Sequence, residues 1–226
     1  MPKNKQDFIV CASAADGSDS WTTWPIGMGP AYVTIHESNT QTGHHTMLVL
    51  SAVTSYTDRG RRPTAPNRDS FLNTLDANGI PNTSLASSDY FRELPNYKFV
   101  VSPEGNGVDC HRHYEALMAG CIPIIEDNPL VRDKYEGCPV LWTRDYSEIV
   151  PGYLEMMYAK MVDQPYDFSR LFMSAYPQSA QREILDSSDA WLLTLTGKRW
   201  YNYRNGIQNG GRRFIWCGTP KDSAYW

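Results

Sequence analysis

Three polar side chains that could carry chemistry lie close together in the middle of the chain: His111, Arg112 and Glu115. On a helix, a rotation of about 100° per residue brings all three within roughly one quadrant. A guanidinium group can bind phosphate through two hydrogen bonds, and a carboxylate can accept hydrogen bonds from the two hydroxyls of a ribose. The three residues therefore predict a nucleotide site, with Arg112 on phosphate and Glu115 on ribose. The alternative is that Arg112 and Glu115 simply pair with each other on a solvated helix face.

The stretch around these residues predicts a βαβ unit. The expected elements are a buried strand at 99–101, a glycine-containing loop at 102–108, a helix at 110–119 and a second buried strand at 121–125. Asp109 has the side chain of an N-cap, and Gly120 is a common residue just past a helix end. Such a unit implies a parallel sheet, with the polar residues beside the carboxyl end of a strand and the positive end of a helix dipole. That environment favours an anion.

The same stretch carries a family resemblance. The segment YKFVVSPEGNGVDCHRHYEALMAGCIPII, followed by PVLWTRDYSEI, resembles the nucleotide-sugar-binding half of exostosin-like glycosyltransferases. The likeness rests on Pro-Glu-Gly-Asn-Gly, Asp-Cys-His-Arg, Glu-Ala-Leu and Gly-Cys-Ile-Pro, in this order and closely spaced. It is close over residues 97–148 and looser over 47–176. The resemblance implies a GT-B architecture, with two Rossmann-like domains, the donor bound to the C-terminal one, and no obligatory metal.

The resemblance also implies roles for individual residues. In the central motif, the residues expected to bind the nucleotide-sugar donor are Asn106, Gly107, Asp109, His111, Arg112 and Glu115. The loop at 54–67 matches a family loop over the diphosphate, so Arg59, Arg61 and Arg62 are expected to offset charge on the departing nucleotide. The alternative for these arginines is a solvated basic loop. Glu104 is expected to face the donor sugar near the bond that breaks. Ten residues separate it from Glu115, a longer spacing than the E-x7-E pattern of other GT-B enzymes.

The N-terminal region departs from the family. Trp24-Pro25-Ile26-Gly27 resembles the segment by which the family enters its donor domain, which implies that most of the acceptor domain is missing. The catalytic base, which inverting GT-B enzymes take from that other domain, is then sought in His36 and Glu37, after an expected strand at 32–35. Loop capping or simple surface polarity is the alternative for both. The expected organisation is a shortened N-terminal region at 1–46, a nucleotide-sugar-binding domain at 47–176, and a C-terminal helix with an aromatic-rich tail at 177–226.

Composition limits the partners. The net charge of −4 argues against a general nucleic-acid-binding protein, and neither an 18-residue apolar run nor a signal-peptide pattern occurs, so we expect a cytoplasmic protein. Five cysteines without a C-x-x-C pair predict reduced, buried thiols rather than zinc ligands. The Asp-x-Asp motif of metal-dependent sugar transferases is absent, which agrees with metal-free chemistry. No cofactor is expected beyond the donor, a sugar on UDP or GDP.

The sequence thus predicts an α/β fold, a Rossmann-like parallel sheet flanked by helices that forms the donor-binding half of a GT-B enzyme. The predicted activity is a metal-independent glycosyltransferase that passes a sugar to a hydroxyl of a glycan or glycoprotein. The alternative is a non-catalytic nucleotide-sugar-binding subunit that needs a partner chain for the acceptor site. Both a homodimer and a separate partner subunit are left open.

Overall fold

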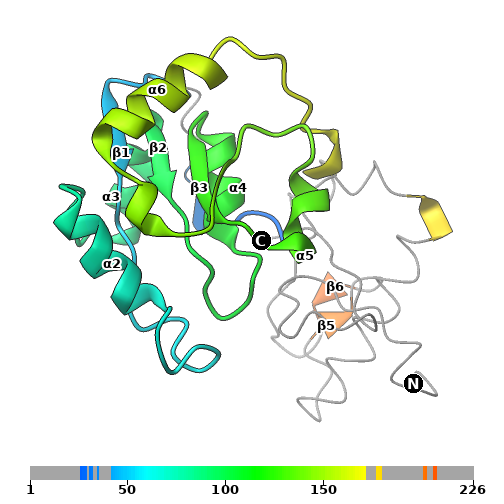
Figure 1. Cartoon of the computed structure of the whole chain (residues 1–226). Coiled ribbons are helices and arrows are strands. Elements are labelled where there is room, and N and C mark those ends of the chain that lie inside the picture. Colours follow the sequence, from blue (N-terminus) through cyan, green and yellow to red (C-terminus); the bar gives the residue numbers. More distant parts are fainter. Residues whose placement is uncertain are drawn as a thin grey trace.

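A parallel four-stranded sheet forms the centre of the chain (Figure 1). The computed structural model describes residues 26–29, 31–32, 35, 42–171, 177–179, 201–202 and 206–207. The strands of the sheet are β1 (Met47–Leu50), β2 (Tyr97–Val101), β3 (Ile122–Glu126) and β4 (Leu141–Thr143), side by side in chain order. All three pairings are parallel, so the carboxyl ends of the strands lie along one edge. The predicted α/β, Rossmann-like parallel sheet is confirmed.

Helices connect the strands and cover both faces of the sheet. They are α2 (Arg68–Ala77), α3 (Ser87–Glu93), α4 (His111–Met118), α5 (Pro129–Arg132) and α6 (Pro151–Met161), with 3-10 turns η2 (Leu94–Asn96), η3 (Asp133–Tyr135), η4 (Tyr146–Glu148) and η5 (Ser169–Leu171). A separate antiparallel pair consists of β5 (Tyr201–Asn202) and β6 (Gly206–Ile207). Every helix in the described part of the chain is too short or too polar to cross a membrane.

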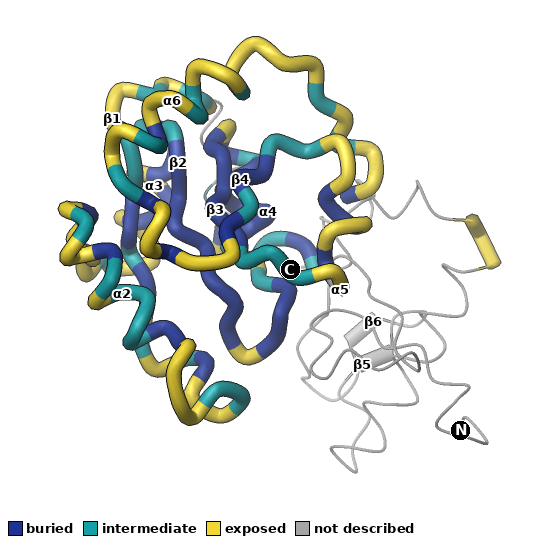
Figure 2. Tube along the Cα trace, viewed as in Figure 1, coloured by how far each residue is buried: buried dark blue, intermediate teal, exposed yellow. Residues whose placement is uncertain are grey.

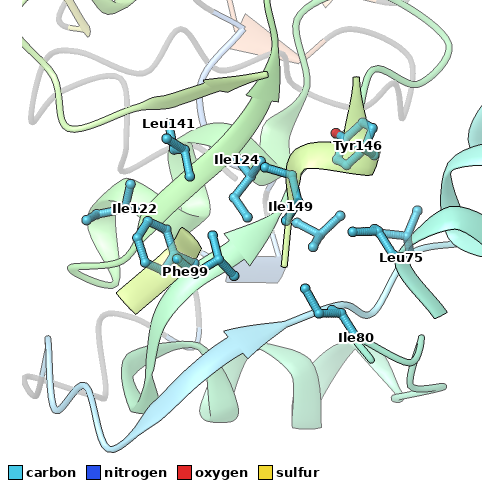
Figure 3. Close-up of a cluster of buried hydrophobic side chains, with 11 residues drawn as sticks. Leu75, Ile80, Phe99, Ile122, Ile124, Leu141, Tyr146 and Ile149 are labelled. Atoms are coloured by element: carbon cyan, nitrogen blue, oxygen red, sulfur yellow. The ribbon is translucent and has the colours of Figure 1, made fainter. Parts of the chain in front are cut away.

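Side-chain alternation along the strands divides the core between the two faces. In β2, Phe99 and Val101 pack with residues of α2 and α6, whereas Val100 packs with residues of α3 and α4. Figure 3 shows the first of these clusters, in which Phe99, Ile124 and Leu75 approach one another from β2, β3 and α2. The last three residues of β2 and nearly all of β3 are buried, whereas in β1 only Leu50 is buried (Figure 2). Burial on both faces explains why the strand sequences are continuous apolar runs.

Local signals set the start of α2 and the end of α4. The side chain of Asn67 accepts a hydrogen bond from the N–H of Ser70, and the Ser70 hydroxyl accepts one from the N–H of Asn67, which starts α2 with a capping box. Gly120 follows α4 with φ +81, and a Cβ there would lie 2.9 Å from the amide nitrogen of Gly43. Glycine is therefore required at the end of α4 both for backbone conformation and for space.

Most expected elements are confirmed, but the strand expected at 32–35 is wrong. Tyr32 and Ile35, the two ends of the strand expected at 32–35, are helical, as is Ala31, and Tyr32 packs edge-on against Phe91 at 5.3 Å between ring centroids. Helix α3 was not expected, because only Tyr90 and Phe91 interrupt its polar sequence. The C-terminal helix and tail expected at 177–226 lie largely outside the described residues, and the boundaries of the expected domains remain predictions.

The described cysteines agree in part with the expectation of reduced, buried thiols, because Cys121 is buried while Cys110 and Cys138 are half-buried. Cys110, Cys121 and Cys138 are free thiols. Burial raises the pKa of each to about 12, so all three stay protonated at neutral pH. These thiols are structural rather than nucleophilic.

Candidate functional site

Charged side chains from three segments meet where β1, β2 and β3 end. We call Arg61, Arg62, Glu104, Glu126 and Asn128 the Arg–Glu cluster. Arg61 Nη2 donates to Glu104 Oε2 at 2.5 Å, and Asn128 Nδ2 donates to Glu104 Oε1 at 2.8 Å. Arg62 Nη1 donates to Glu126 Oε1 at 2.5 Å and lies 3.8 Å from Glu104 Oε2. The cluster forms because parallel strands bring their carboxyl ends, and the loops that follow them, to one edge of the sheet.

The arginine loop after β1 is organised by a single buried acid, Asp58. Its carbonyl oxygen accepts hydrogen bonds from the N–H groups of Arg61 and Arg62 at 3.0 and 2.7 Å. Its Oδ2 accepts Arg62 Nε at 2.9 Å and the backbone N–H of Arg68 at 2.9 Å, so it ties the loop to the start of α2. The guanidinium of Arg62 also stacks 5.1 Å above the centre of the Phe71 ring. The two arginines are therefore held in place, and a freely solvated basic loop is ruled out for them.

The charges in the Arg–Glu cluster stabilise one another. Burial alone would lower the pKa of Arg62, but its hydrogen bond to Glu126 and the charges of Glu104 and Asp58 raise it. Burial raises the pKa of Glu126, and the contact with Arg62 opposes this shift. Each guanidinium carries five N–H donors, so it can hold a carboxylate on one edge and accept a second anion on another. The two arginines and two glutamates of the cluster thus balance in charge.

The predicted nucleotide residues on α4 form a second, partly covered group. The ring Nδ1 of His111 lies 2.6 Å from the carbonyl oxygen of Gly27. Glu115 is only 6% exposed, and its Oε1 accepts the N–H of Gly29 at 3.1 Å. Burial raises the pKa of Glu115, while this hydrogen bond and the charges of Arg112 and His111 oppose the shift. Residues 26–29 therefore lie against the first turns of α4, and Glu115 is not on a solvated face.

Arg112 is the third of the predicted nucleotide-binding residues on α4. Its guanidinium stacks over the ring of Tyr90 at 4.4 Å, which fixes its plane. Its Nη1 is buried and has no hydrogen-bond partner among the described residues. A buried guanidinium nitrogen without an acceptor costs folding free energy, so an oxygen ligand that accepts a hydrogen bond from Nη1 would be favoured here.

Asp109 does not cap α4, which corrects the sequence expectation. The N-cap is Cys110, without a side-chain hydrogen bond. The carboxylate of Asp109 is instead fully buried and accepts four hydrogen bonds. The donors are Lys134 Nζ at 2.7 Å, Tyr135 OH at 2.6 Å, Tyr114 OH at 2.8 Å and the N–H of Ile26 at 3.1 Å. Although burial alone would raise the pKa of Asp109, the charge of Lys134 holds it low. Asp109 is an anchor that ties the start of α4 to η3 and to residue 26.

The remaining predicted residues are dispersed. Arg59 is exposed and pairs with Asp69 at 2.9 Å, apart from the Arg–Glu cluster. Asn106 is exposed at the tip of the loop after β2, and the carbonyl of the buried Gly107 accepts the N–H of Gly105 at 2.9 Å. His36 and Glu37 lie outside the described residues. Among the residues that the structure describes, no three His, Cys, Asp or Glu side chains are grouped to hold a metal ion.

Sequence reasoning missed several members of this edge. Glu126 and Asn128 follow directly on an apolar strand, and aligning the carboxyl ends of the predicted parallel strands would have placed them beside Glu104. Arg68 and Asp58 gave no comparable signal, because a charged residue in a loop or at a helix start is ordinarily solvated.

No family model matches this chain, and a search of curated proteins found no match.

Proposed function

We propose that this chain is the donor-binding part of a metal-independent glycosyltransferase of GT-B type. It would move a sugar from a nucleoside-diphosphate sugar to a hydroxyl of a glycan. The observation that carries the proposal is the placement of Arg61 and Arg62 around the carboxylate of Glu104 at the carboxyl ends of parallel strands. Parallel α/β sheets bind ligands at this edge.

The cluster supplies what a leaving nucleotide requires. When the bond between sugar and phosphate breaks, negative charge grows on the diphosphate, and guanidinium groups held in advance stabilise that charge without first reorganising. Arg61 and Arg62 take this role. Glu104 lies beside them and faces the donor sugar, where its carboxylate accepts hydrogen bonds from sugar hydroxyls.

The α4 group takes the nucleoside side of the donor. Arg112 Nη1 donates a hydrogen bond to a phosphate oxygen, and Glu115 accepts hydrogen bonds from the ribose hydroxyls while the N–H of Gly29 fixes the direction of its carboxylate. His111, Asn106 and Gly107 remain predicted donor contacts. Asp109 contributes indirectly, by holding the start of α4 and residue 26 together.

Calorimetry tests this proposal most directly. The purified chain is titrated with UDP, GDP, ADP and CMP, and the nucleotide that binds is then titrated into Arg61→Met, Arg112→Ala and Glu115→Ala variants. Each variant should lose about 1–3 kcal/mol of binding free energy, the value of a hydrogen bond to a charged group. Arg92→Met, on the exposed outer face of α3, is the matched control and should bind like the unaltered chain. Failure of the unaltered chain to bind any of the four, or unchanged affinity in all three variants, would refute the proposal.

The second candidate is a donor-binding subunit without its own catalysis. A specific observation favours it: Glu104 and Glu126 both accept hydrogen bonds from arginine, so neither is placed to take a proton from an acceptor hydroxyl. Such a subunit would need a base from a partner chain. Incubation of the chain alone with a nucleotide sugar separates the two candidates, because any turnover, including slow hydrolysis of the donor, contradicts the subunit.

A further inference from the structure

Arg68 is a buried cation whose guanidinium contacts only main-chain oxygens in the described hydrogen-bond network. The residue is 5% exposed at the first position of α2. Its Nε donates to the carbonyl of Glu104 at 2.7 Å, Nη2 to that of Pro103 at 3.0 Å, and Nη1 to that of Thr54 at 3.1 Å. One side chain thus joins α2 to the loops that follow β1 and β2.

Burying a guanidinium in this way is expensive. A buried charge is ordinarily paired with an opposite charge, and here burial lowers the pKa of Arg68. The nearby acids Glu104 and Glu126 direct their carboxylates to Arg61 and Arg62 instead. The arrangement keeps the carbonyls of the loop after β2 turned inward, toward Arg68.

Turning those carbonyls inward fixes the backbone of Glu104 from both sides. Its carbonyl oxygen is held by Arg68, and its N–H donates to Glu126 Oε2 at 2.6 Å. The next residue is equally constrained, because a Cβ on Gly105 would lie 3.0 Å from Arg68 Nη2 and 3.4 Å from Cys110 Sγ. From this fixed main chain, the side chain of Glu104 extends toward Arg61 and Asn128.

We propose that Arg68 is the positioning residue of this site: it sets where the Glu104 carboxylate stands relative to the donor sugar, without touching the donor. This inference rests on the proposed function, since it takes Glu104 as the group that contacts the sugar. Lysine cannot replace Arg68 here, because a compact ammonium lacks the planar fork that reaches three carbonyls at once.

The test compares a nucleotide with its nucleotide sugar. UDP and UDP-glucose, or the GDP pair if guanine is preferred, are titrated into Arg68→Lys, Gly105→Ala and the exposed control Arg92→Lys. We expect the Kd of the nucleotide sugar to rise about tenfold in the first two variants, while the Kd of the free nucleotide changes less than about threefold. Gly105→Ala keeps Arg68 in the sequence but places a Cβ against its guanidinium, so it disturbs the same contact between the arginine and the loop. It therefore tests the idea even if Arg68→Lys folds poorly.

Hydrogen exchange gives a readout that does not need the donor. Amides of residues 102–110 should exchange faster in both variants, while those of β2 stay protected as in the control. Equal weakening of UDP and UDP-glucose, unchanged affinity for both, or unchanged exchange at 102–110 would overturn the positioning role. If the unaltered chain binds neither compound, the proposed function itself fails, and the assignment of Glu104 and Arg68 to the donor fails with it.

Discussion

The buried ion pair between Lys134 and Asp109 allows a quantitative test of how the start of α4 is held. Both side chains are almost fully buried, and Nζ lies 2.7 Å from Oδ2. Replacing Lys134 with methionine keeps a long unbranched side chain and removes only the charged, hydrogen-bonding end. The carboxylate of Asp109 would then stay buried among the hydroxyls of Tyr114 and Tyr135 with no cation beside it.

The expected loss is large because breaking a buried pair leaves an uncompensated charge. Removing one partner typically costs about 3–5 kcal/mol. For a domain of this size each kcal/mol lowers Tm by about 2–4 °C, so Tm should fall by roughly 6–20 °C. If the Asp109 carboxylate pointed at a ligand on the surface, removing the neighbouring cation would cost far less stability. The size of the loss therefore distinguishes an anchor from a donor-binding group.

The loss should also depend on pH. In the unaltered chain the pKa of Asp109 is held low by Lys134 against the effect of burial, so the pair contributes stability above the unfolded pKa of about 3.9 and loses it as pH falls through the lower folded value. In Lys134→Met the cation is lost while burial and the hydrogen bonds from Tyr114 and Tyr135 remain, so the pKa of Asp109 rises. The variant can then take up a proton, so the difference in stability should be greatest at pH 7 and smaller at pH 5. Burial lowers the pKa of His113 to about 4, so this neighbour stays neutral at both pH values in the unaltered chain.

Urea unfolding followed by circular dichroism at pH 7 and pH 5 measures both effects. Lys160→Met, on the exposed side of α6, is the matched control and should change stability by less than about 1 kcal/mol. The double variant Asp109→Asn with Lys134→Met removes both charges and should recover part of the loss. A cost below about 1 kcal/mol for Lys134→Met, or the same cost at both pH values, would show that Asp109 is not held as described.

Two further substitutions test other parts of the structure. Gly29→Ala would place a Cβ 2.9 Å from Glu115 Oε1 and should cost about 1–3 kcal/mol of unfolding free energy, because it displaces a buried carboxylate. Gly60→Ala is the control: it has open space around it and should be neutral or slightly stabilising in the same urea experiment. Leu154→Ala in α6, at a fully buried position, should cost about 2–5 kcal/mol by leaving a cavity, and Met156→Ala, an exposed position on the same helix, should cost much less. Equal effects within either pair would contradict the packing described.

Much of the fold could be predicted because short-range sequence patterns determine its strands and helix ends. The apolar run that ends at Val101 predicts β2, and the glycine at 120 predicts the end of α4, since both depend on the chain within a few residues. Helix α3 could not be predicted in this way. Its burial depends on Tyr90 and Phe91 packing against Tyr32, a contact between segments nearly sixty residues apart that leaves no periodic signal in either one.

The candidate site was less predictable, because the partner of a charged residue is chosen by tertiary structure. Asp109 satisfies the local rule for an N-cap, yet its carboxylate binds Lys134, 25 residues away in the sequence. Arg59 and Arg61 are two residues apart in one loop and look equivalent. The first is exposed on Asp69 at the start of α2, whereas the second reaches Glu104 at the carboxyl end of β2. A loop sequence can therefore indicate which edge of the sheet carries charge, but only the neighbouring segments decide which of its charges are held in place to meet a ligand.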